Sequence, residues 1–266
     1  MHPRVKACSL VSGSSGNSIY IATDSTAVLV DAGSSCKRLE NNMAKQDIDP
    51  NTIDAILITH EHSDHIGAVS VLARRYDIPV YSTESTLKAT HAKIRYADKL
   101  SYRPVATEEN FKIKDFSCKA IRVSHDAIEP VCYRIDTGKA IVAVITDIGM
   151  WTNHLSRALA GCDLVFLEAN YDEHMLWTGK YSWPLKKRID SNHGHLSNAQ
   201  SAEAAKGLIE SGTSRLVLIH LSKNNNRPDL VYNYFDKYLE YAGIQNGSDY
   251  SMITANRYEP SLWQYL

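Results

Sequence analysis

The sequence has no run of apolar residues long enough to cross a lipid bilayer, which takes about 20 predominantly apolar residues. It also has no excess of either charge, because 29 basic and 30 acidic residues give a formal net charge of −1. Proteins that coat nucleic acid without sequence preference are normally basic. The balance argues against that class, although metal ions and local patches can still supply positive potential. Because no apolar run is long enough to span a bilayer, we expect no membrane partner.

Cysteine is scarce and scattered. The five cysteines are odd in number and lie mostly inside apolar, strand-like runs, at positions 8, 36, 118, 132 and 162. This distribution predicts reduced, buried thiols rather than a disulfide framework. The first residues, Met1–Lys6, lead into a strand-like run without the apolar core of a signal peptide. We expect a cytoplasmic protein and, since no repeat or Pro-, Gly- or Ser-rich linker divides the chain, one domain over residues 1–266.

Short apolar runs recur along the chain and alternate with helical patterns. Strands are expected near residues 7–11, 18–23, 27–31, 53–59, 79–82, 111–113, 118–123, 132–136, 140–146, 164–168, 215–219 and 250–253. Helices are expected near residues 36–46, 64–76, 85–94, 152–160, 198–211 and 228–242. Strand runs in each half, interleaved with helices, predict an α/β fold, an αβ/βα sandwich of two mixed sheets flanked by helices.

The segment Thr59–Gly67 packs three histidines and an aspartate into six positions, directly after the apolar run Ile53–Ile58. Side chains two apart on an extended chain point the same way, so His60 and His62 can converge on one ion. Asp64 and His65 begin a helix and can face a second ion. Imidazole and carboxylate together suit Zn²⁺, Mn²⁺ or Fe²⁺. A histidine-rich surface loop is the plain alternative, but spacing, position and composition together favour a dinuclear metal site.

Three further ligand types close later strand-like runs. His125, Asp147 and His220 are each the first strong ligand after such a run, where α/β folds collect functional groups. A histidine that closes a strand is often only a satisfied polar group, so each is weak evidence alone. Their order after the histidine cluster strengthens the prediction.

This ordered series resembles the metallo-β-lactamase fold superfamily over nearly the whole chain. The resemblance implies one metal held by His60, His62 and His125. It implies a second metal held by Asp64, His65 and His220, with Asp147 bridging the two ions. It also implies that Asp31 holds a ligand loop by hydrogen bonds, although a simple strand-end turn explains Asp31 equally well.

Two motifs narrow the branch. Gly13–Ser18 is predicted to be a hairpin turn, whose backbone N–H groups, with Ser15 and Asn17, could also hold a phosphate oxygen. Gly194–Asn198 resembles the Gly-His-x-Ser/Thr element of RNase Z and related phosphodiesterases, in which the histidine protonates the leaving oxygen. The resemblance gives that role to His195, whose plain alternative is a loop residue beside a helix cap.

Three weaker features surround these motifs. Glu168 closes a strand and could orient His195 or cap a helix. The polar side chains of the loop His220–Asn226, among them Asn224, could line the pocket or belong to a plain turn. The run from Trp177 to Arg188 interleaves aromatic and basic residues, including Lys180 and Arg188, and either contacts nucleic acid or is a solvated surface.

Taken together, these motifs resemble the YycJ/WalJ branch, which is associated with 5′-to-3′ DNA exonuclease activity. The usual Thr-Asp-Thr-Gly appears here as residues 146–149, Thr-Asp-Ile-Gly, which keeps the ligand and loses a hydroxyl. The interval between Asp147 and His220 has no room for the extra domain of β-CASP nucleases.

The function predicted is a phosphodiesterase with two divalent ions, Zn²⁺ or Mn²⁺ with Fe²⁺ as a further option. It would cleave DNA from a 5′ end, with a metal-bridging hydroxide as nucleophile and Asp64, Glu168 and His195 as catalytic residues. Single strands or recessed ends are expected substrates. The alternatives are a thioester hydrolase of glyoxalase type, an RNA-processing enzyme of RNase Z type and, least favoured, a non-enzymatic scaffold.

Overall fold

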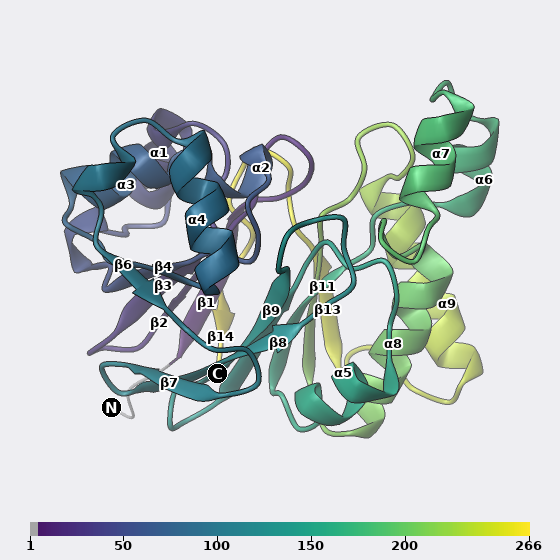
Figure 1. The fold of residues 1–266 in the computed structure, drawn as a ribbon. Coiled ribbons are helices and arrows are strands. Elements are labelled where there is room, and N and C mark those ends of the chain that lie inside the picture. Colours follow the sequence, from purple (N-terminus) through teal and green to yellow (C-terminus); the bar gives the residue numbers. More distant parts are fainter. Residues whose placement is uncertain (1–4) are drawn as a thin grey trace.

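The computed structural model describes residues 5–266 and contains two seven-stranded sheets packed face to face (Figure 1). Residues 1–4, which entered the expectation about a signal peptide, lie outside the described part. In spatial order the first sheet is β14 (Gln264–Tyr265), β1 (Lys6–Val11), β2 (Ser18–Ala22), β3 (Ala27–Val30), β4 (Ala55–Leu57), β5 (Val80–Ser82) and β6 (Tyr102–Pro104). The second is β13 (Ser251–Thr254), β12 (Arg215–Ile219), β11 (Leu164–Glu168), β10 (Ile141–Ile145), β9 (Val131–Asp136), β8 (Phe116–Arg122) and β7 (Asn110–Ile113).

Helices cover the outer face of each sheet (Figure 1). On the N-terminal half they are α1 (Cys36–Lys45), α2 (Ser63–Ile66), α3 (Val69–Arg75) and α4 (Glu84–Lys93), with short 3₁₀ turns at Pro50–Thr52 and Ala97–Lys99. On the C-terminal half they are α5 (Asn153–Leu159), α8 (Asn198–Glu210) and α9 (Pro228–Tyr241), whereas α6 (Glu173–Thr178) and α7 (Trp183–Ile189) lie together beyond the ends of the strands. The predicted αβ/βα sandwich is confirmed. Within residues 5–266, no helix is both long enough and apolar enough to cross a membrane.

The central strands are apolar throughout because both of their faces are buried. In β11, Leu164 and Phe166 pack into the core between the sheets, while Val165 and Leu167 pack under the helices. β3 divides in the same way, with Val28 facing the other sheet. This alternation follows from the two-residue period of a strand.

The helix predicted over residues 64–76 is two helices, α2 and α3. The carbonyl of Asp64 accepts a hydrogen bond from the backbone N–H of Asn17 (2.8 Å), and the N–H of Ala68 donates to Ala32 (2.8 Å). These bonds replace the i→i−4 bond that would continue the helix. A Cβ on Gly33 would stand 1.7 Å from the carbonyl oxygen of Asp64, so this close approach requires glycine. Through these bonds the segment after β4 is held to the turn before β2 and to the end of β3.

Two strands and two α-helices were also not predicted. The strands β6 and β14 are short edge strands, α6 ends at the start of the basic and aromatic run, and α7 lies in its second half. α6 is capped by Asp172, whose side chain accepts from the N–H of Met175 (2.8 Å), and α7 has Pro184 in its first turn. These are recognised helix-start signals, so both helices were within reach of the sequence.

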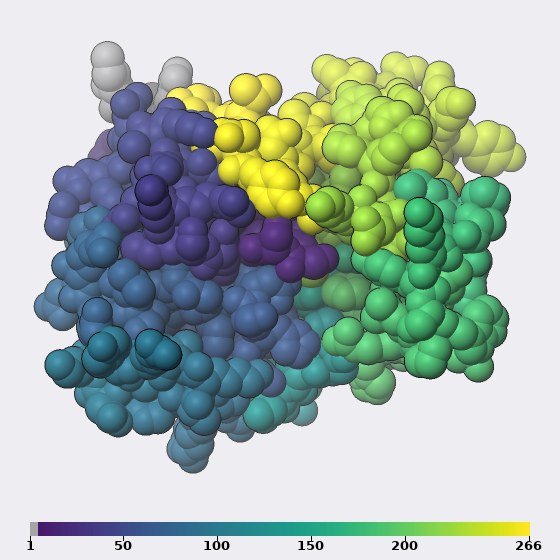
Figure 2. All heavy atoms as spheres, turned by 90° about the horizontal axis from the view of Figure 1, so that it is seen from above, coloured from purple at the N-terminus to yellow at the C-terminus, as the bar shows by residue number. Residues whose placement is uncertain are grey.

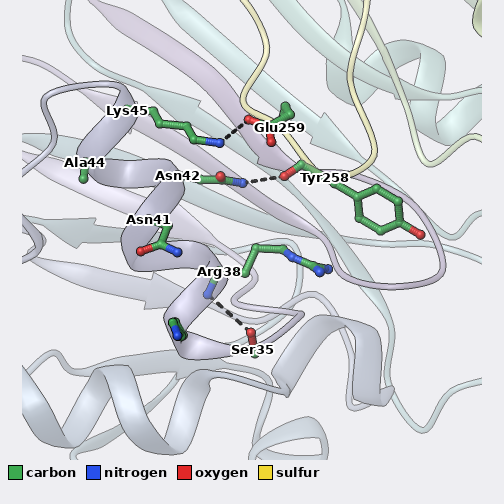
Figure 3. A pocket seen from close by; sticks show the side chains of 9 residues that line it. Ser35, Arg38, Asn41, Asn42, Ala44, Lys45, Tyr258 and Glu259 are labelled. Atoms are coloured by element: carbon green, nitrogen blue, oxygen red, sulfur yellow. Dashed lines mark hydrogen bonds and ion pairs between the residues drawn. The ribbon is translucent and has the colours of Figure 1, made fainter.

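The C-terminal segment returns to the N-terminal half and packs on α1. The side-chain amide of Asn42 donates to the carbonyl of Tyr258 (2.9 Å), and Lys45 forms an ion pair with Glu259 (Figure 3). A surface hollow of 830 Å³ lies between α1 and this segment. The contact fastens the edge of the first sheet, where β14 pairs with β1.

Candidate metal centre

The predicted ligands and their supports meet at one end of the sandwich, where the strands β3, β4, β8, β10, β11 and β12 end. In Figure 2, which looks down on these strand ends, the N-terminal half in purple and blue faces the green helical part across the centre. Asp31, Asp147 and His220 follow β3, β10 and β12 directly or nearly so, and all three have left-handed backbones, with φ of 62°, 53° and 55°. Such a conformation costs a non-glycine residue about 1–2 kcal/mol. It persists only where surrounding contacts enforce it, and here it turns three side chains sharply off their strands.

One group of donors consists of His60, His62 and His125. Their ring centroids lie 4.6 to 5.1 Å apart, and each offers a nitrogen within 4.8 Å of the others. Nδ1 of His125 lies 3.0 Å from the carbonyl oxygen of Gly194 and therefore carries the proton. That tautomer leaves Nε2 as an acceptor facing the group.

Burial favours the neutral, ligand-competent form of these rings. Desolvation lowers the pKa of His125 and lowers the pKa of His60 well below its ordinary value. The Nε2 atoms of both rings are buried without any hydrogen-bond partner in the described structure. Buried polar atoms are almost always paired, so these two nitrogens are suited to an electrophile such as a metal ion.

A second group consists of Asp64, His65 and His220, again with donor atoms within 4.8 Å of one another. Asp31 fixes the ring of His65, because its Oδ2 lies 2.8 Å from Nδ1 of His65. The other oxygen of Asp31 accepts from the backbone N–H of Thr59 (2.8 Å). Asp31 thus clamps the histidine loop and directs Nε2 of His65 into the site, an arrangement typical of residues that support a ligand.

Asp147 stands between the two groups. Its Oδ2 lies 3.0 Å from Nε2 of His65 and 3.1 Å from Nδ1 of His220, whereas its Oδ1 lies 3.6 Å from Nε2 of His125. Burial alone would lower the pKa of His220, but Asp147 and Glu168 outweigh it and raise this pKa to about 10. The carboxylates therefore create a strongly negative potential that favours a cation. Buried imidazoles, carboxylates and two unpaired nitrogens fit divalent metal ions.

His195 and Glu168 form a pair beside these groups. Nδ1 of His195 lies 3.1 Å from Oε1 of Glu168, which also accepts from the N–H of Leu196 (3.0 Å). The other oxygen of Glu168 accepts from the backbone N–H of Asp147. The ring of His195 lies 5.4 Å from that of His125 and 5.3 Å from that of His220. Its donor distances would also allow it to be a ligand together with Asp147, Glu168 and His220.

The alternative in which Glu168 caps a helix is wrong. The N-cap of α8 is Ser197, which accepts from the N–H of Gln200 (3.3 Å), while the side chain of Gln200 accepts from the N–H of Ser197 (2.9 Å). This capping box satisfies the helix end. Glu168 is therefore free to hold His195.

A cavity of 220 Å³ opens over the centre. One wall comes from α7 and the loop before it, which contribute Tyr181, Leu185 and Arg188. Arg188 is also paired with Asp126 through its Nε (2.6 Å). The remaining lining residues are Ser14, His62, Asp64, His125, Asp147, Asn170, Ile189, His195, His220 and Ser222.

Among the residues named as substrate or support candidates, Asn17 and Arg188 lie at the site. Nδ2 of Asn17 is 3.0 Å from Nε2 of His65 and 3.4 Å from Oδ2 of Asp64, while its Oδ1 accepts from the N–H of Gly13 (2.8 Å). The predicted hairpin between β1 and β2 is confirmed. It presents Asn17 to the donors of the second group, and the phosphate-binding role of its backbone N–H groups stays a prediction.

Three of these candidates neither line the cavity nor bond to a residue of the two donor groups. Ser15 is exposed, and its neighbour Ser14 takes the lining position. The amide of Asn224 turns away to donate to the hydroxyl of Tyr181 (3.0 Å). Lys180 is exposed outside the lining. Lys186, a basic residue of the same run, is buried, with Nζ bonded to the carbonyl of Trp177 (2.8 Å). A run of polar residues does not show which of two neighbouring side chains lines the cavity, or that a helix turns a basic side chain into the interior.

Sequence reasoning did not name Asn170 as a site residue. Nδ2 of Asn170 donates to the carbonyl of His220 (2.9 Å) and so holds the strand end that carries this histidine. Asn170 belongs to the same short motif as Glu168, which was the available signal. Ser222 and Tyr181 lie in two segments that the sequence marked, the polar loop after His220 and the aromatic and basic run, and both line the cavity.

Comparison with known proteins assigns the chain to a family. The model of the beta-lactamase superfamily domain matches residues 26–221. The exodeoxyribonuclease YycJ of Bacillus anthracis is 36% identical over 259 residues, covering 97% of both chains. The exodeoxyribonuclease WalJ of Streptococcus pneumoniae is 38% identical over 246 residues, covering 91% of both.

Solved structures share the fold at low identity. The metallo-beta-lactamase fold protein YhfI from Bacillus subtilis aligns with a TM-score of 0.76 at 15% identity, over 99% of this chain and 100% of its own. The short form of human tRNase Z aligns with a TM-score of 0.66 at 16% identity, over 97% and 98%. With the match of the family model and the two relatives that are more than one-third identical, the conclusion is direct: the chain belongs to the beta-lactamase superfamily, as a metal-dependent hydrolase of its metallo-β-lactamase fold that resembles the YycJ/WalJ branch.

Proposed function

We propose that the protein is a two-metal phosphodiesterase that removes nucleotides from the 5′ end of DNA. The observation that carries the proposal is the pair of His195 and Glu168, which stands beside two groups of metal donors in a 220 Å³ cavity. The two curated relatives named as exodeoxyribonucleases support the substrate class.

The donors divide between the two ions as follows. His60, His62 and His125 would hold one ion, Asp64, His65 and His220 would hold the other, and Asp147, which lies between the two groups, would be shared by both. Divalent ions in such a site lower the pKa of water and neutralise phosphate charge. Asp31 and Asn17 keep the loop of Asp64 and His65 in place through the bonds described above.

His195 supplies the proton that the leaving oxygen needs. Because Oε1 of Glu168 lies 3.1 Å from Nδ1 of His195, the carboxylate accepts a hydrogen bond from Nδ1–H and fixes the ring, and the proton on Nδ1 stays on the imidazole. Nε2 then carries the second proton of the imidazolium and delivers it to the departing sugar oxygen. Glu168 is buried and His195 has a side chain 16% exposed, so the carboxylate acts through the imidazole and does not touch substrate. A positioned acid of this kind typically contributes 10²–10⁴-fold in rate.

Substrate contacts come from the wall of α7. Arg188 and Tyr181 line the cavity and can hold the phosphate and sugar next to the scissile bond. The cavity is small, and the net charge of −1 offers little general attraction to a polyanion. Single strands and recessed ends therefore fit better than an intact double helix, with binding that weakens as salt rises.

The test is an incubation of purified protein with end-labelled single-stranded DNA, RNA and a thioester, each with Mn²⁺ or Zn²⁺. Stepwise release of nucleotides from the 5′ end of DNA is the expected result. Turnover of the thioester with intact nucleic acid would replace the proposal by a glyoxalase-like activity. Cleavage of tRNA trailers without attack on DNA would replace it by an RNA-processing one.

A further inference from the structure

A second hollow lies behind the histidine-rich segment Thr59–Gly67, which we call the metal loop, on the other side of α2. Asp64 of α2 lines the cavity over the metal centre, whereas Ser63, Ile66 and Gly67 of the same short segment line a hollow of 380 Å³. Its remaining wall comes from α3, the end of α4 and the turn that follows (Figure 1). We call it the basic pocket; its other lining residues are Ser70, Val71, Arg74, Lys93, Ile94, Arg95 and Tyr96.

The basic pocket carries three positive charges and no negative one. None of its lining residues is acidic, and no ion pair recorded within residues 5–266 includes Arg74, Lys93 or Arg95. Nζ of Lys93 donates to the carbonyl of Glu61 (3.0 Å), between two predicted ligands, and keeps two further N–H donors. Three cations gathered in one concave surface without a carboxylate create a potential that attracts an anion.

Tyr96 adds an aromatic surface to this charge. Its side chain is 59% exposed, and the guanidinium of Arg74 lies over its ring at 4.3 Å. The backbone of Tyr96 is left-handed, with φ of 57°, a conformation that is unfavourable for tyrosine. The floor beside it is apolar, since Ile66 is buried and Ile94 is half-buried. Cations together with an exposed ring are what single-stranded nucleic acid binds, without sequence preference.

We propose that the basic pocket binds one nucleotide of the single strand whose scissile phosphate lies at the metal centre. Arg74, Lys93 and Arg95 hold the phosphate, and the base packs against Tyr96 and the apolar floor. The volume of 380 Å³ falls within the range of ligand pockets, about 300–1,000 Å³. The inference rests on the proposed nuclease function and adds the path that the strand takes, across α2.

The larger hollow beside α1 does not compete for this role. It also stacks an arginine, Arg38, near an exposed ring, Tyr258, at 4.9 Å (Figure 3). Its other cations are Lys37 and Lys45, but its lining includes an acidic residue, Glu259, which pairs with Lys45, and none of its lining residues belongs to the metal loop.

The experiment measures KM and kcat on a single strand of about 12 nucleotides, a length that fits known strand-binding sites. The variants are the double charge reversal Arg74→Glu with Arg95→Glu, and Tyr96→Asn, which removes the ring while asparagine tolerates the left-handed backbone. Lys139→Glu is the matched control, because Lys139 is an exposed cation in the turn between β9 and β10, at the opposite end of β10 from Asp147.

The double reversal should raise KM for the strand by at least about tenfold at low salt and flatten the salt dependence by about two phosphate contacts. Tyr96→Asn should raise it about fivefold or more, through the lost stacking. Lys139→Glu should leave it unchanged. A nitrophenyl phosphodiester reaches only the metal centre, so its turnover reports whether each variant keeps an intact centre.

An unchanged KM for the strand in both pocket variants, with DNA cleavage by the wild type, would refute the inference and leave the proposed function standing. If the wild type does not cleave DNA, fluorescence anisotropy with the same labelled strand decides: binding lost only in the pocket variants keeps the site without the nuclease, and equal binding in all proteins refutes it. Free deoxynucleoside monophosphate is the last arm. Pocket variants that change only its inhibition would assign the basic pocket to a free nucleotide and overturn the strand path.

Discussion

The two walls of the cavity over the metal centre are built in different ways. On the strand-end wall, His60, His65 and Asp147 are at most 3% exposed, and buried hydrogen bonds hold each of them. The opposite wall consists of α7 and the loop before it, which pack against α6, and we call it the α6–α7 wall. It has its own small core of Tyr171, Leu176 and Ile189, separate from the cores of the two sheets.

The α6–α7 wall is also more exposed. The side chain of Arg188 is 54% exposed, and Trp183, 59% exposed, stands next to Trp177 at 5.1 Å. An element with few buried contacts can shift at small cost. The strand-end wall is therefore suited to chemistry, which needs fixed geometry, and the α6–α7 wall to recognition of a substrate.

The largest effect should come from breaking the strand-end wall at its centre. Asp147→Ala should abolish hydrolysis and lower metal content, because this side chain is the contact shared by both donor groups. Metal analysis and circular dichroism check the two halves of the prediction, loss of ions with a retained fold. Asp136→Ala, in β9 at the end of the sheet remote from the centre, is the control. Full activity that survives both the substitution and chelation would refute the metal-dependent reading.

The next effect should come from His195, which lies in the loop between α7 and α8 and is bonded to Glu168 at the end of β11. His195→Ala should keep the metals and lose kcat by about 10²–10⁴-fold, roughly 3–5 kcal/mol of barrier. A nitrophenyl phosphodiester has a good leaving group and should lose much less. His193→Ala is the matched control, since His193 is exposed and bonded to Ser124 at 3.0 Å. Loss of a metal ion in His195→Ala would make it a ligand, which its donor distances allow.

The same contrast explains what the sequence could reveal. The strand-end wall consists of residues that directly follow apolar runs, so spacing and residue type brought together His60, His62, His125, Asp147 and His220. The left-handed backbones at three strand ends left no trace in composition. The α6–α7 wall depends on how two short helices pack, which the sequence does not show. Ser15, Asn224 and Lys180 do not line the cavity, because a run of polar residues does not show which side chain points inward.

A smaller effect should come from the support behind the ligands. Asp31→Asn keeps the size of the side chain and tolerates the left-handed φ of 62°, but weakens the acceptor at Nδ1 of His65 and at Thr59. Loss of such a support typically lowers metal affinity by about 10–100-fold. Competition with a chelator of known affinity measures it, and excess metal should restore kcat. Unchanged affinity would reduce Asp31 to a strand-end turn, the alternative that its sequence position left open.

The smallest effect tests the α6–α7 wall alone. Arg188→Ala removes an exposed cation that is already paired with Asp126, and exposed ion pairs contribute only about 0.2–1 kcal/mol. KM for single-stranded DNA should therefore rise by about two- to fivefold, with unchanged metal content and turnover of the nitrophenyl substrate. Lys187→Ala is the control, because this neighbouring cation lies over Trp183 at 5.4 Å and outside the cavity. If Arg188→Ala lost metal, or slowed both substrates equally, the two walls would be one rigid unit, since a change on the exposed wall would then have reached the buried ligands.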